Sequence, residues 1–316
     1  MFKKNSPIFI AGSSGLIGRA CEKVLVDKGY RNILTPSSKE LDLTDSVQVK
    51  NYFSSHKIDF VILAAGKVGG IIENKKNPVD FLTTNLPIQL NIFSSAINRN
   101  CTKVVFLGSS CMYPKECKQP MSEEDLFTGK MEPTSMAYAV SKIAGLQLGF
   151  SYNQQFSSDK FLCVIPNSAY GPGDNFNSKS GHVLAALINR FHKAKVEHSD
   201  TVELWGTGTP KREFIYSEDI ADAIIFLLEK GINTKDLPIN IGSGEDYSIL
   251  ELAEIIRMTT NFKGAINWNT SMPDGAPRKL LDSSNINSYG WHPKTNITSG
   301  LKKTYQWFLK NIAAHE

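Results

Sequence analysis

The strongest indication of fold in this 316-residue chain is the stretch Ile8-Phe9-Ile10-Ala11-Gly12-Ser13-Ser14-Gly15-Leu16-Ile17-Gly18. Four apolar residues, typical of a buried strand, lead directly into three glycines with the spacing G-x-x-G-x-x-G. Glycines permit a tight turn and a close backbone approach, and the N-terminus of the following helix attracts a pyrophosphate. A glycine turn alone is a weak signal, but its place after the first strand of an α/β pattern predicts a dinucleotide site. We expect every residue from Gly12 to Gly18 to contact the dinucleotide.

Short apolar runs alternate with helix-like segments over the first half of the chain. We expect further strands at residues 33–35, 60–65, 103–107 and 161–165. Helices are expected at residues 16–28, 46–54 and 85–96. Because the strands are wholly apolar, they are predicted to be buried on both faces, as in a parallel sheet between two layers of helices. The predicted fold class is therefore α/β, a Rossmann-type doubly wound parallel sheet.

The regular alternation of strand-like and helix-like segments ends at Tyr170-Gly171-Pro172-Gly173. Further helices are expected at residues 182–194 and 219–229. Further strands are expected at residues 202–205 and 239–241. We expect a dinucleotide-binding domain over residues 1–170, to which the chain returns from about residue 213 to 243. A smaller, partly interleaved C-terminal substrate domain is expected over most of residues 171–316.

The composition argues against several classes of protein. A formal net charge of +4, without a concentrated Lys/Arg run, gives no support for nucleic-acid binding. The longest wholly apolar run, residues 60–65, is far shorter than the roughly 20 residues that cross a bilayer, so no membrane association is expected. A secretory signal is rejected because Gly12 and Arg19 interrupt the first apolar segment. The 5 cysteines show neither paired nor metal-ligand spacing, which indicates reduced thiols, a cytoplasmic protein and no metal.

The segment after the second strand bears on the choice of cofactor. An NAD site usually has Asp or Glu there for the ribose hydroxyls, whereas this chain reads Thr35-Pro36-Ser37-Ser38-Lys39 before its first carboxylate. Hydroxyls and a lysine suit a 2′-phosphate, so we expect NADP(H), with Ser38 and Lys39 at the phosphate. Asp42 is expected beside the adenine.

A tyrosine and a lysine stand one helical turn apart, at Tyr138 and Lys142. Pro133-Thr134-Ser135 is a helix-start signal, with Thr134 or Ser135 as the cap, and the i, i+4 spacing puts Tyr138 and Lys142 on one face. A phenol has a reference pKa of about 10, and a nearby ammonium favours the phenolate and brings proton transfer into range. Spacing alone favours an ordinary amphipathic helix with a core tyrosine and a surface lysine.

The glycine loop, Ser109 at the end of the fourth strand and Y-x-x-x-K on the next helix together resemble the extended branch of the short-chain dehydrogenase/reductase superfamily. The resemblance implies that Ser109 orients a carbonyl, Tyr138 transfers a proton, and Lys142 tunes Tyr138 and holds the nicotinamide ribose. Further cofactor contacts are expected from Ala64, Ala65, Leu107, Gly108, Pro166, Asn167 and His182. The role of Asn167 stays open because the family usually reads P-T-N-L where this chain has Pro166-Asn167-Ser168-Ala169.

Cys111 narrows the chemistry further. Nucleotide-sugar dehydratases of this superfamily carry Glu two residues after the catalytic Ser or Thr, so a cysteine there disfavours dehydration. Nearly continuous similarity from about residue 8 to Leu309 links the chain to the GDP-L-fucose synthase family. The strings that carry this resemblance are Val68-Gly69-Gly70-Ile71, Cys111-Met112-Tyr113-Pro114-Lys115, Asp174-Asn175-Phe176, His182-Val183, Arg212-Glu213-Phe214 and Pro273-Asp274-Gly275.

That family converts GDP-4-keto-6-deoxy-D-mannose to GDP-L-fucose. The C4 ketone acidifies the hydrogens at C3 and C5, so a base and an acid on opposite sides can invert both centres through enolates before NADPH reduces the ketone. The resemblance assigns this acid/base pair to Cys111 and His182, with Ser109 and Tyr138 stabilising each enolate oxygen. Tyr138 would then protonate the alkoxide.

The helix-start position of His182 suits this role independently. Ser180-Gly181 is typical of a helix entry, which places His182 in the first turn, where the helix dipole disfavours imidazolium. A thiol, with a reference pKa of about 8.5, gains thiolate character near positive charge. Apart from the surrounding motifs, a helix-start histidine is more often a surface capping residue, and a lone cysteine more often a small core residue.

The two phosphates of a GDP-sugar need cationic partners, and the arginine fork matches them. The resemblance implies substrate contacts from Arg190, Trp205, Arg212 and Asp282, with Lys279 as a weaker candidate. A solvated helix face is the alternative for Arg190. Many bacterial family members carry Arg where this chain has Ser14 and Ser38, and Lys39 is the cation that could compensate.

Two other functions stay open at this stage. One is a related GDP-sugar epimerase/reductase that acts on a colitose-type or heptose 4-keto sugar, and the other is a catalytically silent NADP-binding protein. The presence of Ser109, Tyr138 and Lys142 argues against the silent protein. Family members are usually homodimers built from two helices per subunit, here residues 85–96 and 137–152, so a homodimer is expected.

Overall fold

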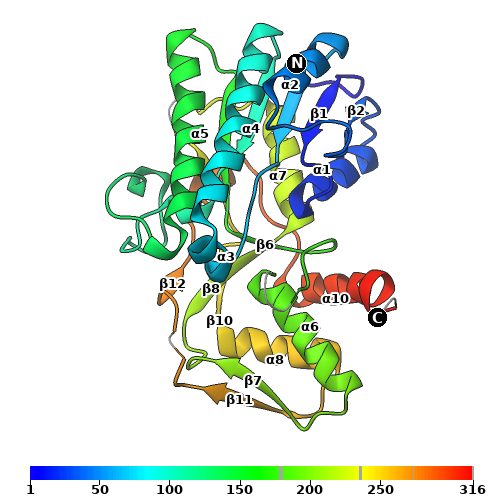
Figure 1. Cartoon of the computed structure of the whole chain (residues 1–316), viewed down its shortest axis with the longest axis vertical. Helices are drawn as coiled ribbons and strands as arrows, with labels where there is room; N and C mark the ends of the chain where they lie inside the picture. Colours follow the sequence, from blue (N-terminus) through cyan, green and yellow to red (C-terminus); the bar gives the residue numbers. More distant parts are fainter. Residues whose placement is uncertain (178–180, 235–236, 273, 315–316) are drawn as a thin grey trace.

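A computed structural model describes residues 1–177, 181–234, 237–272 and 274–314 of the chain (Figure 1). Its main sheet has six strands in the order β2-β1-β3-β4-β5-β9, and every neighbouring pair is parallel. The strands are β1 (Ile8–Ala11), β2 (Ile33–Leu34), β3 (Phe60–Leu63), β4 (Lys103–Leu107), β5 (Phe161–Pro166) and β9 (Ile239–Ile241). The predicted doubly wound parallel sheet is confirmed.

Helices cover both faces of this sheet. The helices α1 (Leu16–Asp27) and α7 (Ser217–Lys230) lie together on one face, and α2 (Ser46–Ser55), α4 (Pro78–Asn98) and α5 (Met136–Gln155) lie on the other. Side chains alternate along β1, so that Ile8 and Ile10 belong to one core while Phe9 and Ala11 belong to the second. Each such burial stabilises the fold by about 1.5–3 kcal/mol for an Ile or Phe side chain. Burial on both faces explains why these strands are almost entirely apolar, with Lys103 in β4 and Asn240 in β9 as polar exceptions.

The remaining elements build the lower part of Figure 1 and the connections to it. They are α3 (Ile71–Lys76), β6 (Ser168–Tyr170), α6 (Val183–Val196), β7 (Thr201–Trp205), β8 (Lys211–Tyr216), β10 (Asp246–Ser248), α8 (Ile249–Thr260), β11 (Ala265–Asn269), β12 (Arg278–Lys279), α9 (Ser284–Ser288) and α10 (Ile297–Phe308). Three short 3₁₀ turns span Ser110–Met112, Glu123–Asp125 and Pro133–Ser135, and a π-turn spans Leu309–Ala313. A third apolar core joins α6, α8 and α10 through Phe191, Leu252 and Phe308.

Most helix bounds differ from the sequence-based expectation by one to three residues, and two of the differences have a clear physical meaning. The helix expected at residues 85–96 begins at Pro78 instead, where the missing proline N–H costs nothing because first-turn donors have no helical partner. The helix expected from residue 182 begins at Val183, with His182 as its N-cap. None of the helices within the described residues is long and apolar enough to span a membrane.

Candidate active site

The glycine loop has no room for side chains at two of its glycines. A Cβ at Gly12 would lie 2.6 Å from the Cα of Ala65, and one at Gly18 would lie 2.1 Å from the carbonyl oxygen of Gly12. Gly12 also has φ +87°, in the left-handed region. Gly15 is the N-cap of α1 and has no side chain to bond the first-turn N–H groups, which are left for a ligand. This cradle fits the pyrophosphate of a dinucleotide.

The segment after β2 fits a phosphorylated ribose better than a bare one. Its first carboxylate, Glu40, accepts hydrogen bonds from the backbone N–H and the hydroxyl of Ser37, at 2.7 and 2.8 Å, and these bonds lower the pKa of Glu40. The carboxylate of Asp42 is likewise occupied, by the backbone N–H and hydroxyl of Thr44. Ser38 and Lys39, which immediately precede Glu40, are exposed. A hydroxyl and an ammonium are therefore the accessible groups there.

Four predicted catalytic residues meet where β4 ends. Ser109 caps the Ser110–Met112 turn, and its Oγ accepts a hydrogen bond from the backbone N–H of Cys111 at 3.2 Å. Tyr138, on α5, hydrogen-bonds Ser109 and interacts electrostatically with Cys111. The Nζ of Lys142 lies 5.9 Å from the centroid of the Tyr138 ring. A hydroxyl, a thiol, a phenol and an ammonium thus share one location.

The protonation of Tyr138 differs from the sequence-based expectation. Burial raises the pKa of Tyr138, the neighbouring Cys111 raises it further, and the hydrogen bond from Ser109 only partly opposes this. Lys142 does not draw the phenol toward phenolate, because its Nζ donates to the carbonyl oxygen of Leu107 at 2.9 Å and faces the ring of Phe106. Burial lowers the pKa of Lys142 to about 8. In the free protein, Tyr138 is therefore a neutral phenol, equipped to donate a proton.

The start of α5 also differs from the expectation. Neither Thr134 nor Ser135 caps it with a side-chain oxygen; the carboxylate of Glu132 accepts from the backbone N–H of Thr134 at 3.2 Å. Glu132 therefore caps the 3₁₀ turn that precedes α5. The sequence pattern located the helix start but not the capping group.

His182 is paired with a buried carboxylate that the sequence analysis did not single out. Its Nδ1 lies 3.2 Å from Oδ1 of Asp174, whose side chain is 3% exposed against 44% for His182. The bond to Asp174 raises the pKa of His182, and partial burial opposes the rise. The expected effect of the helix start has the opposite direction, because the bond to Asp174 raises the pKa of His182 instead of lowering it. Ser180, part of the predicted helix entry, lies outside the described residues, as does Pro273 of the Pro273-Asp274-Gly275 string.

Engagement of Nδ1 fixes the role of the other ring nitrogen. With Nδ1–H donated to Asp174, Nε2 is left to face a ligand. The raised pKa keeps His182 protonated at higher pH than an ordinary histidine. The pair can therefore deliver a proton from Nε2.

The predicted substrate residues come from strands β7, β8 and β12 and from α6. Lys279 and Arg212 are register partners in the parallel β12–β8 pair, so they lie side by side. Burial lowers the pKa of Arg212, and a Cβ at Gly275 would lie 2.9 Å from its guanidinium. Trp205 is 56% exposed at the end of β7, and Arg190 donates to the backbone carbonyl of Glu203 at 2.8 Å.

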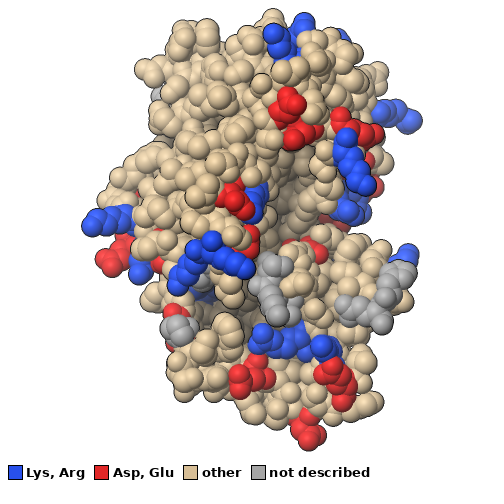
Figure 2. All heavy atoms as spheres, viewed as in Figure 1, with Lys and Arg blue, Asp and Glu red and all other residues tan. Residues whose placement is uncertain are grey.

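The last predicted substrate residue, Asp282, has its backbone fixed on both sides. Its N–H donates to Met121 and its carbonyl accepts from Asn240. The surface in Figure 2 is hollowed between the part that holds the six-stranded sheet and the part that holds α6 and α8. A nucleotide-sugar that reaches from Arg212 to Tyr138 would have to lie along this border.

Asn167, whose role the sequence left open, is buried. Its side-chain amide donates to the carboxylate of Glu213, and its own Oδ1 accepts from the backbone N–H of Ser168. Asn167 therefore ties the end of β5 to β8.

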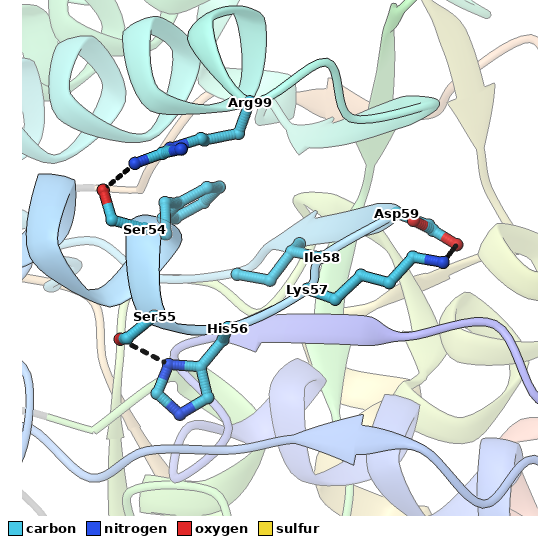
Figure 3. Close-up of a pocket in the computed structure, with 8 residues that line it drawn as sticks. Ser54, Ser55, His56, Lys57, Ile58, Asp59 and Arg99 are labelled. Atoms are coloured by element: carbon cyan, nitrogen blue, oxygen red, sulfur yellow. Dashed lines mark hydrogen bonds and ion pairs between the residues drawn. The ribbon is translucent and has the colours of Figure 1, made fainter.

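A separate hollow lies at the amino end of β3, away from the strand ends that carry the site (Figure 3). It has a volume of about 370 Å³ and is lined by residues 53–59 and Arg99. Its polar groups bond one another, as His56 does with Ser55 and Arg99 with Ser54. None of the predicted site residues lines it, so it is not the candidate active site.

Comparison with known proteins identifies the family of the chain. A model of the NAD dependent epimerase/dehydratase family matches residues 8–242. The chain belongs to this family. Within it, the chain is 45% identical to GDP-L-fucose synthase 1 of Arabidopsis thaliana, over 99% of this chain and 96% of that one. It is 38% identical to GDP-L-colitose synthase of Yersinia pseudotuberculosis, over 96% and 97%. The structure of a GDP-L-fucose synthetase from Naegleria fowleri bound to NADP matches with a TM-score of 0.91 and 29% identity, over 99% and 95%.

Proposed function

We propose that this family member converts GDP-4-keto-6-deoxy-D-mannose to GDP-L-fucose, by 3,5-epimerisation and then NADPH-dependent reduction at C4. The observation that carries the proposal is the thiol of Cys111 beside Ser109 and Tyr138, where a dehydratase would need a carboxylate. Full-length likeness to GDP-L-fucose synthase supports it.

In the epimerisation, Cys111 and His182 act on opposite faces of the sugar ring. Cys111 takes the proton from C3 or C5, the electron pair of that C–H bond moves toward the C4 oxygen, and His182 returns a proton to the opposite face. Ser109 and Tyr138 donate hydrogen bonds to the C4 oxygen while it carries negative charge. The assignment of His182 as the acid follows from Asp174, which favours the protonated imidazole. Exchange with solvent resets the pair before the second centre is inverted.

In the reduction, Tyr138 donates its proton to the C4 oxygen. Lys142 stabilises the phenolate left behind once its Nζ turns from the carbonyl of Leu107 toward the phenol. Bound NADPH supplies the hydride. Residues Gly12 to Gly18 would hold its pyrophosphate, and Ser38 and Lys39 its 2′-phosphate. A neutral phenol in the free protein suits this step, because the proton is already in place.

The apolar cores suggest which part of the molecule binds the cofactor and which part binds the nucleotide-sugar. We infer that the six-stranded sheet holds NADP(H), while the lobe built on the third core presents Arg190, Trp205 and Arg212 to GDP. Guanidinium groups match phosphates in geometry and charge.

The decisive assay is to mix the protein with NADPH and GDP-4-keto-6-deoxy-D-mannose. We expect stoichiometric oxidation of NADPH and GDP-L-fucose as the product identified by NMR. A product that keeps the D-manno configuration at C3 and C5 would contradict the epimerase half. Oxidation only with a 3,6-dideoxy or heptose 4-keto substrate would favour the alternative function that the colitose synthase relative supports.

We also infer a cytoplasmic homodimer that pairs through α4 and α5, which lie side by side (Figure 1). One face of α4 exposes Val79, Leu86 and Leu90, and the adjoining face of α5 exposes Met136 and Val140. A contiguous apolar face of this kind marks an interaction site, and a second copy offers the same face by symmetry.

The dimer is tested by light scattering after chromatography. Leu90→Glu should give a monomer, whereas Met258→Glu, at a more exposed apolar residue on α8, should leave the dimer intact. A wild-type monomer, or a dimer that survives Leu90→Glu, would contradict this interface.

A further inference from the structure

Glu213 is a charged residue that lies wholly inside the molecule. Its side chain, on β8, is 0% exposed. Its carboxylate accepts from the backbone N–H of Gly244 at 2.8 Å, the backbone N–H of Leu281 at 3.0 Å, and the side-chain amide of Asn167. Burial raises the pKa of Glu213, and the hydrogen bonds from these donors oppose the rise. A group that faces several donors at once must accept on all sides, which an ionised carboxylate does and an amide does not.

These donors, together with the hydroxyl of Ser243 at 3.5 Å, belong to three segments far apart in the chain. Asn167 follows β5, Gly244 lies in the turn between β9 and β10, and Leu281 follows β12. Backbone pairing between β12 and β8 covers only Arg278 and Lys279, so the bond from Leu281 to Glu213 takes over where this pairing ends. Glu213 is therefore one of the groups that fix the chain after β12, together with Met121 and Asn240, which bond the backbone of Asp282.

This position matters because the neighbouring residues are the predicted substrate contacts. Arg212 immediately precedes Glu213, Lys279 is the register partner of Arg212, and Asp282 immediately follows Leu281. We propose that Glu213 is a positioning residue for the nucleotide-sugar, which holds Arg212, Lys279 and Asp282 in one arrangement through its bonds to three segments. The proposal rests on the function proposed above, which places these residues at the GDP moiety.

Glu213→Gln is the sharpest test because it keeps the shape and replaces one accepting oxygen with an NH₂ donor. That donor must face either the N–H of Gly244, beside the Ser243 hydroxyl, or the donors of Leu281 and Asn167. In both orientations it meets at least one N–H group, so one of these segments moves away. We expect the dissociation constant for GDP, measured by calorimetry, to rise about tenfold or more. The dissociation constant for NADPH, measured by fluorescence, should rise much less than that for GDP. The glycine loop is untouched, and only Asn167 among the predicted cofactor contacts bonds Glu213. Glu213→Asp, which keeps the charge, should recover part of the GDP affinity.

A matched control separates positioning from plain stability. Asn153→Ala removes a buried side chain that bonds the backbone of Phe161 at the far end of α5, so it should lower the melting temperature without weakening GDP binding. Wild-type GDP affinity in Glu213→Gln, or an equal loss of GDP and NADPH binding, would overturn the proposal. If Glu213→Gln is not recovered folded, Glu213→Asp is measured alone, and wild-type GDP affinity there overturns it.

Arg212→Ala shows which proposal has failed. Wild-type GDP affinity in Arg212→Ala would mean that the nucleotide-sugar lies elsewhere, which contradicts the proposed site itself. Weakened GDP binding in Arg212→Ala together with wild-type binding in Glu213→Gln would leave the site standing and remove only the role of Glu213.

Discussion

The cofactor half and the sugar half of the candidate site are held in place in different ways. In the cofactor half, Gly12 to Gly18, Ser109 and Lys142 are positioned by a strand end, a helix start and bonds within one or two turns or to adjacent strands. In the sugar half, His182 and the segment near Asp282 depend on buried carboxylates, Asp174 and Glu213, supplied from elsewhere in the chain. The first arrangement is robust because regular backbone geometry enforces it, whereas the second depends on side-chain bonds between segments far apart in the chain.

The largest effect is expected for Tyr138→Phe, which tests the cofactor half. Loss of the proton donor should reduce the rate of ketone reduction by about 10²–10⁴-fold, while NADPH affinity is kept. NADPH oxidation under single-turnover conditions measures the rate. Tyr152→Phe, later on the same helix and bonded only to the Ser94 hydroxyl at 3.4 Å, is the control and should react at the wild-type rate. A Tyr138→Phe variant that matches this control would contradict the assigned role.

A smaller but still large effect is expected for Gly12→Ala. The new Cβ would meet the backbone at Ala65 and require a non-glycine residue at φ +87°. Strain of about 1–3 kcal/mol corresponds to NADPH binding weakened roughly 5- to 150-fold. Gly15→Ala, whose Cβ would lie 3.4 Å from the Gly12 carbonyl, is the matched control and should bind NADPH more tightly than Gly12→Ala. The reverse order in a fluorescence titration would contradict the cradle.

In the sugar half, Asp174→Asn should shift the alkaline side of the pH profile of epimerisation to lower pH without abolishing activity. Because Asp174 raises the pKa of His182, its removal lowers that pKa toward 6.5, and the alkaline fall in epimerisation moves to lower pH. The same pair stabilises the fold below the unfolded pKa of histidine, and this contribution is lost as pH rises through the folded value. The pH profile of hydrogen exchange at C3 and C5, together with an NMR titration of His182, measures both effects. An unchanged alkaline limb would contradict the acid role of His182.

The smallest effect is expected for Lys39→Ala, which tests the cofactor preference. Loss of one charge-assisted bond to the 2′-phosphate, worth about 1.5 kcal/mol, should lower kcat/KM with NADPH about tenfold and leave NADH unchanged. Lys50→Ala, an exposed lysine on α2, is the control. An equal change with both cofactors would place the 2′-phosphate elsewhere.

The same contrast explains how much the sequence could predict. The fold, the glycine loop and the meeting of Ser109, Cys111 and Tyr138 depend on short-range patterns, since strand ends of a parallel sheet collect at one edge. Asp174 and Glu213 stand inside quoted strings, but their partners are set by tertiary contacts, such as Leu281 for Glu213, that spacing cannot show. The protonation of His182 and Tyr138 was mispredicted for the same reason: a helix start and an i+4 lysine are visible in the sequence, whereas a bond to Asp174 or to the carbonyl of Leu107 is not.

The central claim is that a thiol inverts carbon centres in a site that also reduces a ketone. Its most direct test is the incorporation of solvent deuterium at C3 and C5 of GDP-4-keto-6-deoxy-D-mannose, with Cys111→Ser compared with wild type. We predict that incorporation falls at least about 100-fold in Cys111→Ser while NADPH affinity is kept. Incorporation at the wild-type rate would contradict the claim and leave a plain ketone reductase.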